Sequence, residues 1–170
     1  RISYYDATNG DLKYASKTGG AWTIETVDAG GDVGYFTCLV LDPLGSPRIG
    51  YYDFTNKDLR YAVKSGSAWT IEEAYSSGDA GWWTSLALDV HGNPRISYHD
   101  ATNGDLKYAR RLGATWAIET LDATGNVGYF TTLVLDSQGN PRIGYTQNTT
   151  ADLKYVSAAI EMGSPSPGDV

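Results

Sequence analysis

The sequence predicts an all-β protein that is built from copies of one four-stranded unit. The first observation is a repeated segment that starts at Arg1, Arg48, Arg95 and Arg142, so that successive copies lie 47 residues apart without an insertion. The second is that each copy contains short stretches rich in aromatic and β-branched residues, separated by turn residues and without a helical rhythm. A fixed period of about 20 to 50 residues indicates a repeat architecture. Four hairpin-linked strands in each repeat are typical of one blade of a β-propeller.

The unit at 35–81 shows the expected order of the strands. An apolar first strand is followed by a turn with Gly and Pro, where Pro can open the second strand without removing a needed donor. An Asn-containing turn precedes the third strand, and a Ser-Gly turn precedes the fourth. Within this unit the predicted strands are 35–42, 48–53, 58–64 and 69–74.

Two of the repeat units are incomplete in this sequence. The first strand occurs three times, at 35–42, 82–89 and 129–136, and the Trp of the next fourth strand would fall at position 163, which is Gly. We therefore predict about four blades over residues 1–157, two of them partial. Residues 158–170 are expected to form a divergent last strand and a linker-like tail rich in Gly, Ser and Pro. The chain begins within a unit and without Met, so we expect a processed product or a fragment that is completed by further blades or by self-association.

Composition excludes several classes of partner. The 170 residues carry a net charge of −7, and the basic residues are spread along the repeats, which argues against nucleic acid as a partner. No stretch approaches the roughly 20 apolar residues of a membrane-spanning helix, so no membrane insertion is expected. The single cysteine, Cys38, excludes a disulfide within the chain and is expected to be a small buried residue.

The segment SLALDVHGNPRISYHDATNGDLKYA at 85–109 resembles propeller repeats of the NHL and sialidase-like (BNR) kind. The resemblance covers about residues 1–156 and implies a propeller fold and an extracellular or cell-surface location. It implies no catalytic set. No copy contains the sialidase Asp-box, roughly Ser-x-Asp-x-Gly-x-Thr-Trp, which argues against sialidase activity. The spacing from Asp6 to Trp22 is also too long for that motif.

Aromatic doublets at the entry to each first strand are the candidate ligand-binding residues. Aromatic faces stack on sugar rings and suit wet interfaces, and propeller ligands bind at rims or between blades. Packing between blades is the alternative interpretation. The Trp pair differs from its counterparts and is the preferred candidate if a single blade binds. The candidates are Tyr35, Phe36, Trp82, Trp83, Tyr129 and Phe130.

A loop of the form Asp-x-Thr-Asn-x-Asp occurs in three units and is a candidate Ca²⁺ site. Closely spaced oxygen ligands on a tight loop can hold this cation. The alternative is a hairpin turn in which Asp accepts hydrogen bonds from turn amides. No other cofactor is expected. The residues are Asp6, Asn9, Asp11, Asp53, Asn56, Asp58, Asp100, Asn103 and Asp105.

Other recurring polar residues have a structural interpretation. Each recurring Arg is expected to form a bidentate pair across a turn with the Asp six residues earlier, although sialidases use three arginines to hold a carboxylate. His91 and His99 are expected to be ordinary surface or packing residues. The glutamates of the fourth strands are not expected to converge on one site. The residues concerned are Arg48, Arg95 and Arg142 with Asp42, Asp89 and Asp136, and Glu25, Glu72 and Glu119.

These observations favour a non-enzymatic, extracellular binding module that recognises glycan or another surface polymer. Repeated aromatic loops and the near-identity of the copies support this hypothesis, because equal weak sites suit multivalent binding. One alternative is a structural propeller that pairs with other chains in a filament or surface layer. Another is a fragment of a sialidase-like hydrolase, and fold alone does not decide among the three.

Overall fold

The computed structural model describes residues 1–157, which form fourteen β-strands and no helix. The strands are arranged in four antiparallel sheets, named here the first to the fourth in chain order. The first sheet contains β1 (Ile2–Asp6), β2 (Asp11–Thr18) and β3 (Ala21–Asp28). The second contains β4 (Val33–Leu41), β5 (Pro47–Asp53), β6 (Asp58–Ser65) and β7 (Ala68–Tyr75). The third contains β8 (Ala80–Leu88), β9 (Pro94–Asp100), β10 (Asp105–Leu112) and β11 (Thr115–Asp122), and the fourth contains β12 (Val127–Leu135), β13 (Pro141–Gln147) and β14 (Leu153–Ser157).

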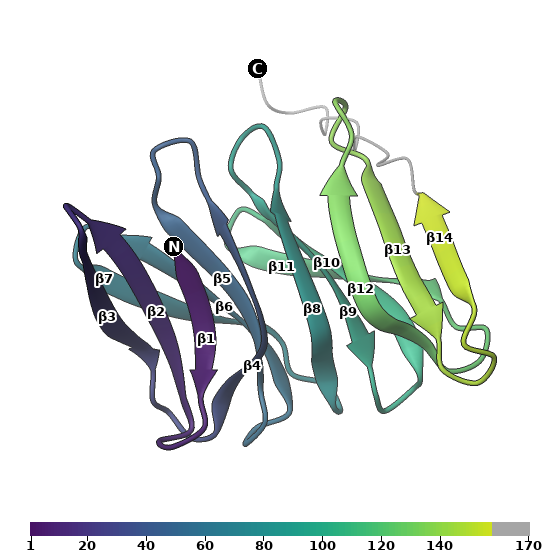
Figure 1. Cartoon of the computed structure of the whole chain (residues 1–170). Coiled ribbons are helices and arrows are strands. Elements are labelled where there is room, and N and C mark those ends of the chain that lie inside the picture. The colour runs from purple at the N-terminus through teal and green to yellow at the C-terminus, as the bar shows by residue number, and fades with distance from the viewer. Residues whose placement is uncertain (158–170) are drawn as a thin grey trace.

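The four sheets lie face to face in an open row (Figure 1). In each complete sheet the strands follow one another in chain order, so every connection within the sheet is a hairpin. The strands β4, β8 and β12 come first in their sheets and contact one another along the row. The described residues form blade-like sheets and do not close a ring.

The predicted strands are confirmed to within two residues at each end. The second and third sheets have the same strand lengths, and each strand of the third begins 47 residues after its counterpart, as Pro47 and Pro94 show. The first sheet lacks the strand equivalent to β4, as predicted. The prediction for 158–170, including position 163, lies outside the described residues.

The core lies between the sheets, where apolar side chains from neighbouring sheets pack together. Three clusters fill the three interfaces, and fully buried tyrosines such as Tyr51, Tyr61 and Tyr98 supply much of their volume. Gly34 lets β4 approach the first sheet closely, because an added Cβ would lie 2.9 Å from the Cα of Leu12. Its φ of +103° also favours glycine. Gly81 and Gly128 occupy the same place in the third and fourth sheets.

The predicted Arg–Asp pairs are present across all three turns, but the expected bidentate geometry is wrong. Asp42 accepts from Arg48 Nη2 at 2.9 Å, Asp89 from Arg95 Nη2 at 2.7 Å, and Asp136 from Arg142 Nη2 at 2.8 Å. Each contact uses one guanidinium nitrogen, because the other carboxylate oxygen accepts from backbone amides of the turn. The carboxylate therefore fixes the turn and the following strand together.

Two glutamates of the outer strands link neighbouring sheets, whereas Glu119 pairs with Arg110 within the third sheet at 2.9 Å. Glu25 on β3 pairs with Lys64 on β6 and accepts from Trp69 Nε1 on β7 at 3.2 Å. Glu72 on β7 pairs with Arg111 on β10 at 2.9 Å. These contacts are consistent with the expectation that the glutamates do not converge on one site.

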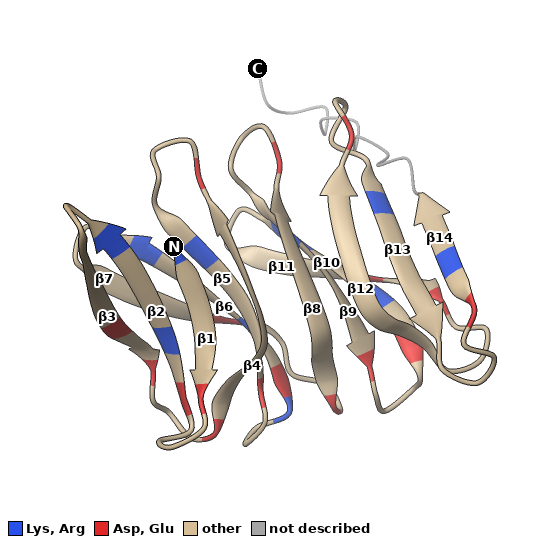
Figure 2. Ribbon diagram, viewed as in Figure 1, with Lys and Arg blue, Asp and Glu red and all other residues tan. Residues whose placement is uncertain are grey.

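Charged residues are distributed unevenly along the strands (Figure 2). Acidic residues gather at strand ends and in the hairpin turns, whereas most Lys and Arg lie along strands. No helix among residues 1–157 is long and apolar enough to cross a membrane.

Candidate functional site

The predicted aromatic doublets form one continuous row of rings across the four sheets. From the first sheet to the fourth, Tyr5 contacts Tyr35 at 4.1 Å between ring centroids, Phe36 contacts Trp82 at 5.3 Å, and Trp83 contacts Tyr129 at 4.2 Å. The two rings of each doublet also contact each other. We call these rings the aromatic row; its members are Tyr5, Tyr35, Phe36, Trp82, Trp83, Tyr129 and Phe130.

The second ring of each doublet lies on a β-bulge with a left-handed backbone. Phe36, Trp83 and Phe130 have φ values of 51°, 51° and 50°. The register with the next strand shifts at the same place in each sheet, between Tyr35 and Cys38 in the second. Such a backbone is unfavourable by roughly 1–2 kcal/mol for a residue with a Cβ, and bulges re-aim side chains. The same conformation is therefore maintained in all three copies.

Threonines that follow these residues hold the bulges against the neighbouring sheet. Thr131 donates to the carbonyl oxygen of Trp83 at 3.1 Å and lies 2.7 Å from Ser97 Oγ. Thr37 donates to Ser3 Oγ at 2.8 Å. A shallow cavity of about 290 Å³ is lined by the three bulge residues and their threonines, namely Phe36, Thr37, Trp83, Thr84, Phe130 and Thr131.

The first and second interfaces are closed near the row by a tyrosine–aspartate hydrogen bond. Tyr5 donates to Asp32 Oδ1 at 2.7 Å between the first and second sheets. Tyr52 donates to Asp79 Oδ1 at 2.7 Å between the second and third, where Trp82 Nε1 donates to the same oxygen at 2.6 Å. Burial and the hydrogen bond to Asp79 raise the pKa of Tyr52 above its ordinary value. Both tyrosines therefore remain protonated donors at neutral pH.

The third interface, between the third and fourth sheets, differs at each of these positions. His99 replaces the tyrosine and Asn126 replaces the aspartate, and no hydrogen bond joins the two in the described structure. His99 Nδ1 instead lies 2.6 Å from the carbonyl oxygen of Val127, to which it must donate. Asn126 Nδ2 donates to Tyr129 Oη at 2.9 Å. Burial lowers the pKa of His99, so its ring is neutral at pH 7 and Nε2 is an acceptor.

A small, mainly apolar cavity of about 130 Å³ lies at this third interface. Ala101 stands there where the second sheet has Phe54, whose ring packs on Tyr35 and Tyr52. The smaller side chain leaves room that the large ring fills in the second sheet. The residues that line the cavity, called here the rim pocket, are Trp82, Trp83, His99, Ala101 and Tyr129.

The candidate calcium loops are hydrogen-bonded turns. Asp6 accepts from the amide of Thr8 at 3.1 Å and from Asn9 Nδ2 at 2.9 Å, and Asp53 and Asp100 accept from Asn56 and Asn103 in the same way. Lys13, Arg60 and Lys107 lie beside these carboxylates. Asp11, Asp58 and Asp105 begin the next strands. Within 1–157 no group of three or more His, Cys, Asp or Glu side chains is arranged to hold a metal ion. The geometry agrees with the turn interpretation, and calcium binding stays a prediction.

Sequence reasoning missed the three substitutions that open the third interface. It singled out Trp82 and Trp83 but assigned no ligand role to His99, and it did not consider Ala101 or Asn126. A signal was available in the aligned repeats, because all three residues differ from their counterparts Tyr52, Phe54 and Asp79 in the preceding unit.

The chain resembles known proteins at the level of solved structures. No protein-family model and no curated protein matches the chain. A fucose lectin from Kordia zhangzhouensis, solved in complex with methyl-fucoside, is similar over 72% of this chain and 97% of its own, with 18% identity and a TM-score of 0.48. Similarity at this level does not identify a ligand for this chain.

Proposed function

We propose that this chain is a non-enzymatic carbohydrate-binding module and that the rim pocket takes one saccharide unit. The observation that carries the proposal is the cavity at the third interface, which opens within a continuous row of aromatic rings. Rings such as Trp82 and Trp83 present faces on which the C–H groups of a sugar can stack. Small-molecule sites combine such apolar walls with a few polar groups that fix orientation.

The polar groups around the rim pocket favour an uncharged ligand. His99 is neutral and offers an acceptor at Nε2, and Asn126 replaces an aspartate. A hydroxyl group can donate to the imidazole and accept from an amide, whereas a charged group would find no opposite charge among these residues. A neutral sugar satisfies both requirements.

The wider architecture is part of the same proposal. The four sheets would be blades of a β-propeller, the rings would lie at one rim of it, and the module would act outside the cell or at its surface. The uniform spacing of the strands and the face-to-face packing of the sheets support the propeller. Binding to a repetitive polymer would suit the repeated row, because linked weak sites gain avidity.

A glycan array with the wild-type chain and two variants tests the proposal. Ala101→Phe inserts the ring that already occupies the equivalent place in the second sheet, so it should fill the rim pocket, abolish binding there and weaken binding on the array. Ala7→Phe makes the same change at the equivalent loop of the first sheet and should bind as wild type does. Equal binding by wild type and Ala101→Phe, or no binding to any glycan by wild type, would contradict the proposal.

The array should be run with calcium and with EDTA. Because Asp6, Asp53 and Asp100 are already engaged by turn amides and cations, we expect EDTA to leave binding unchanged. A loss of binding in EDTA would assign the loops to a metal site and would contradict this part of the reasoning.

Exposed apolar side chains favour assembly with other chains as a second candidate function. Leu153 and Tyr155 on β14 are 82% and 64% exposed, and Ile24 on β3 is 63% exposed. The counterparts of Leu153 and Tyr155 in the middle sheets, such as Leu59 and Tyr61, are buried between neighbouring sheets, and the counterparts of Ile24 are half-buried. Sedimentation equilibrium tests this function: a concentration-dependent mass above the monomer supports it, and a constant monomer mass refutes it.

A further inference from the structure

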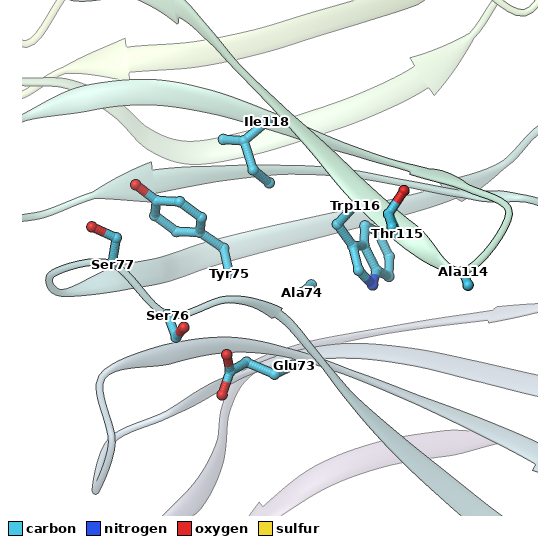
Figure 3. Close-up of a pocket in the computed structure, with 9 residues that line it drawn as sticks. All are labelled: Glu73, Ala74, Tyr75, Ser76, Ser77, Ala114, Thr115, Trp116 and Ile118. Carbon is cyan, nitrogen blue, oxygen red and sulfur yellow. The ribbon is translucent and has the colours of Figure 1, made fainter.

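A cavity larger than the rim pocket lies away from the aromatic row, between the outer strands of the second and third sheets. Its volume is about 420 Å³. Figure 3 shows Tyr75 and Trp116 on opposite sides of it, with Ile118 above and Glu73 below. None of its lining residues belongs to the row. The lining residues, called here the outer cleft, are Glu73, Ala74, Tyr75, Ser76, Ser77, Ala114, Thr115, Trp116 and Ile118.

Trp116 brings an unused hydrogen-bond donor to this cleft. Its Nε1 is buried and has no hydrogen-bond partner within residues 1–157. At the preceding interface the equivalent atom, Trp69 Nε1, donates to Glu25 at 3.2 Å. An indole N–H can only donate, and a buried donor without an acceptor is unfavourable. The glutamate equivalent to Glu25 at this interface, Glu72, pairs with Arg111 and does not accept from Trp116, so the indole N–H of Trp116 is left without an acceptor.

The same interface leaves a second polar group without a partner. Tyr98 Oη is buried and unpaired, whereas the equivalent Tyr51 Oη donates to Asp28 Oδ2 at 2.6 Å. The difference arises from position 75, where Tyr replaces the aspartate found at positions 28 and 122. Tyr75 therefore provides no acceptor for Tyr98 and instead forms an aromatic wall of the cleft. The centroid of its ring lies 6.0 Å from that of Tyr98.

We propose that the outer cleft is a second binding site, which takes a neutral saccharide unit through an acceptor oxygen placed on Trp116 Nε1. Tyr75, Trp116 and Ile118 supply apolar surface for the C–H face of the sugar, and Glu73 can accept from its hydroxyl groups. An anionic ligand is disfavoured because Glu73 lines the cleft and the neighbouring Arg111 is already paired with Glu72. The site is separate from the rim pocket and does not depend on it.

Indole N–H signals in a ¹⁵N NMR titration of the wild-type chain test both sites at once. The five Trp residues give five signals, which single Trp→Phe variants assign. The probes are methyl glycosides of glucose, galactose, mannose and fucose, each added to excess. We expect the Trp116 signal to move downfield and to saturate with at least one probe, while the Trp69 signal, already bonded to Glu25, stays in place. An unmoved Trp116 signal with every probe would overturn the proposal.

This experiment tests the two proposed sites independently of each other. Movement of Trp82 and Trp83 alone supports the rim pocket and refutes the outer cleft. Movement of Trp116 alone has the opposite meaning. Movement of all three supports both sites.

Two variants make the assignment specific. Trp116→Phe keeps an aromatic wall but removes the donor, so affinity at the cleft should fall about tenfold. Tyr75→Asp introduces the residue found at the equivalent positions 28 and 122, which should give the Tyr98 hydroxyl an acceptor and remove one wall of the cleft. That variant should be at least as stable as wild type and should lose binding at the cleft. Undiminished binding by both variants would overturn the proposal.

Discussion

Removing two buried tyrosine hydroxyls at equivalent positions should change stability in opposite directions. Tyr51 Oη donates to Asp28 at 2.6 Å, while the equivalent Tyr98 Oη has no partner. Both side chains are 0% exposed, so the two changes to Phe differ only in the hydrogen bond. Tyr51→Phe deletes a hydrogen bond to a charged group and should destabilise the fold by about 2 kcal/mol.

Tyr98→Phe removes a buried hydroxyl group that forms no hydrogen bond within residues 1–157. The desolvation penalty of such a group is about 1–3 kcal/mol, so this change should stabilise the fold by about 1 kcal/mol. For a chain of this size, each kcal/mol corresponds to a shift of about 2–4 °C in the midpoint of thermal unfolding. Thermal unfolding followed by far-ultraviolet circular dichroism, together with urea titration, measures both variants. If Tyr98→Phe lowered stability as much as Tyr51→Phe, the hydroxyl would have a partner and the reasoning would be wrong.

Three further predictions concern the site, the turns and acid stability. Replacing Tyr52, Phe54 and Asp79 by His, Ala and Asn should create a second rim pocket at the second interface. Calorimetry should then find one additional saccharide site per chain. An unchanged stoichiometry would show that these three residues do not define the rim pocket. Asp89→Ala should destabilise the fold by about 3 kcal/mol because it leaves the buried Arg95 unpaired. Asp136→Ala, beside the more exposed Arg142, should have a smaller effect on the free energy of unfolding. Urea titration measures both variants, and equal losses of stability would refute the burial argument. Burial alone would raise the pKa of Asp122, but hydrogen bonds from Lys154 and Tyr145 lower it to about 2, below the ordinary 3.8. The contribution of Asp122 to stability is therefore complete above about pH 4 and is lost as the pH falls through 2. The stability difference between wild type and Asp122→Asn should shrink over that range, and a constant difference would contradict the assignment.

Much of the strand order could be predicted because it depends on local sequence. Turn residues such as Gly45 and Asn56 recur at the same place in each unit, and strands joined by short hairpins pair with their neighbours in the chain. The Arg48–Asp42 pair was equally accessible, since both residues flank one turn. The strand bounds, the incomplete first sheet and the Arg–Asp pairs were therefore all correctly predicted.

The contacts between sheets could not be predicted in the same way. The link between Glu25 and Lys64 joins residues 39 positions apart in different units, and the partner of Tyr98 is absent because of a substitution in another sheet. The left-handed backbone at Trp83 carries no glycine or asparagine signal. The aromatic row was found by composition, but its continuity and the rim pocket depend on how the sheets pack.

The packing of each sheet mainly against the sheets next to it in the chain has a consequence for the order of folding. Structure can spread from one sheet to the next, as it does in repeat proteins, without waiting for distant parts of the chain to meet. A sheet can thus dock on its predecessor as soon as its own hairpins have formed. The second and third sheets have a neighbour on both faces, so their amide protons should exchange with solvent more slowly than those of the first and fourth.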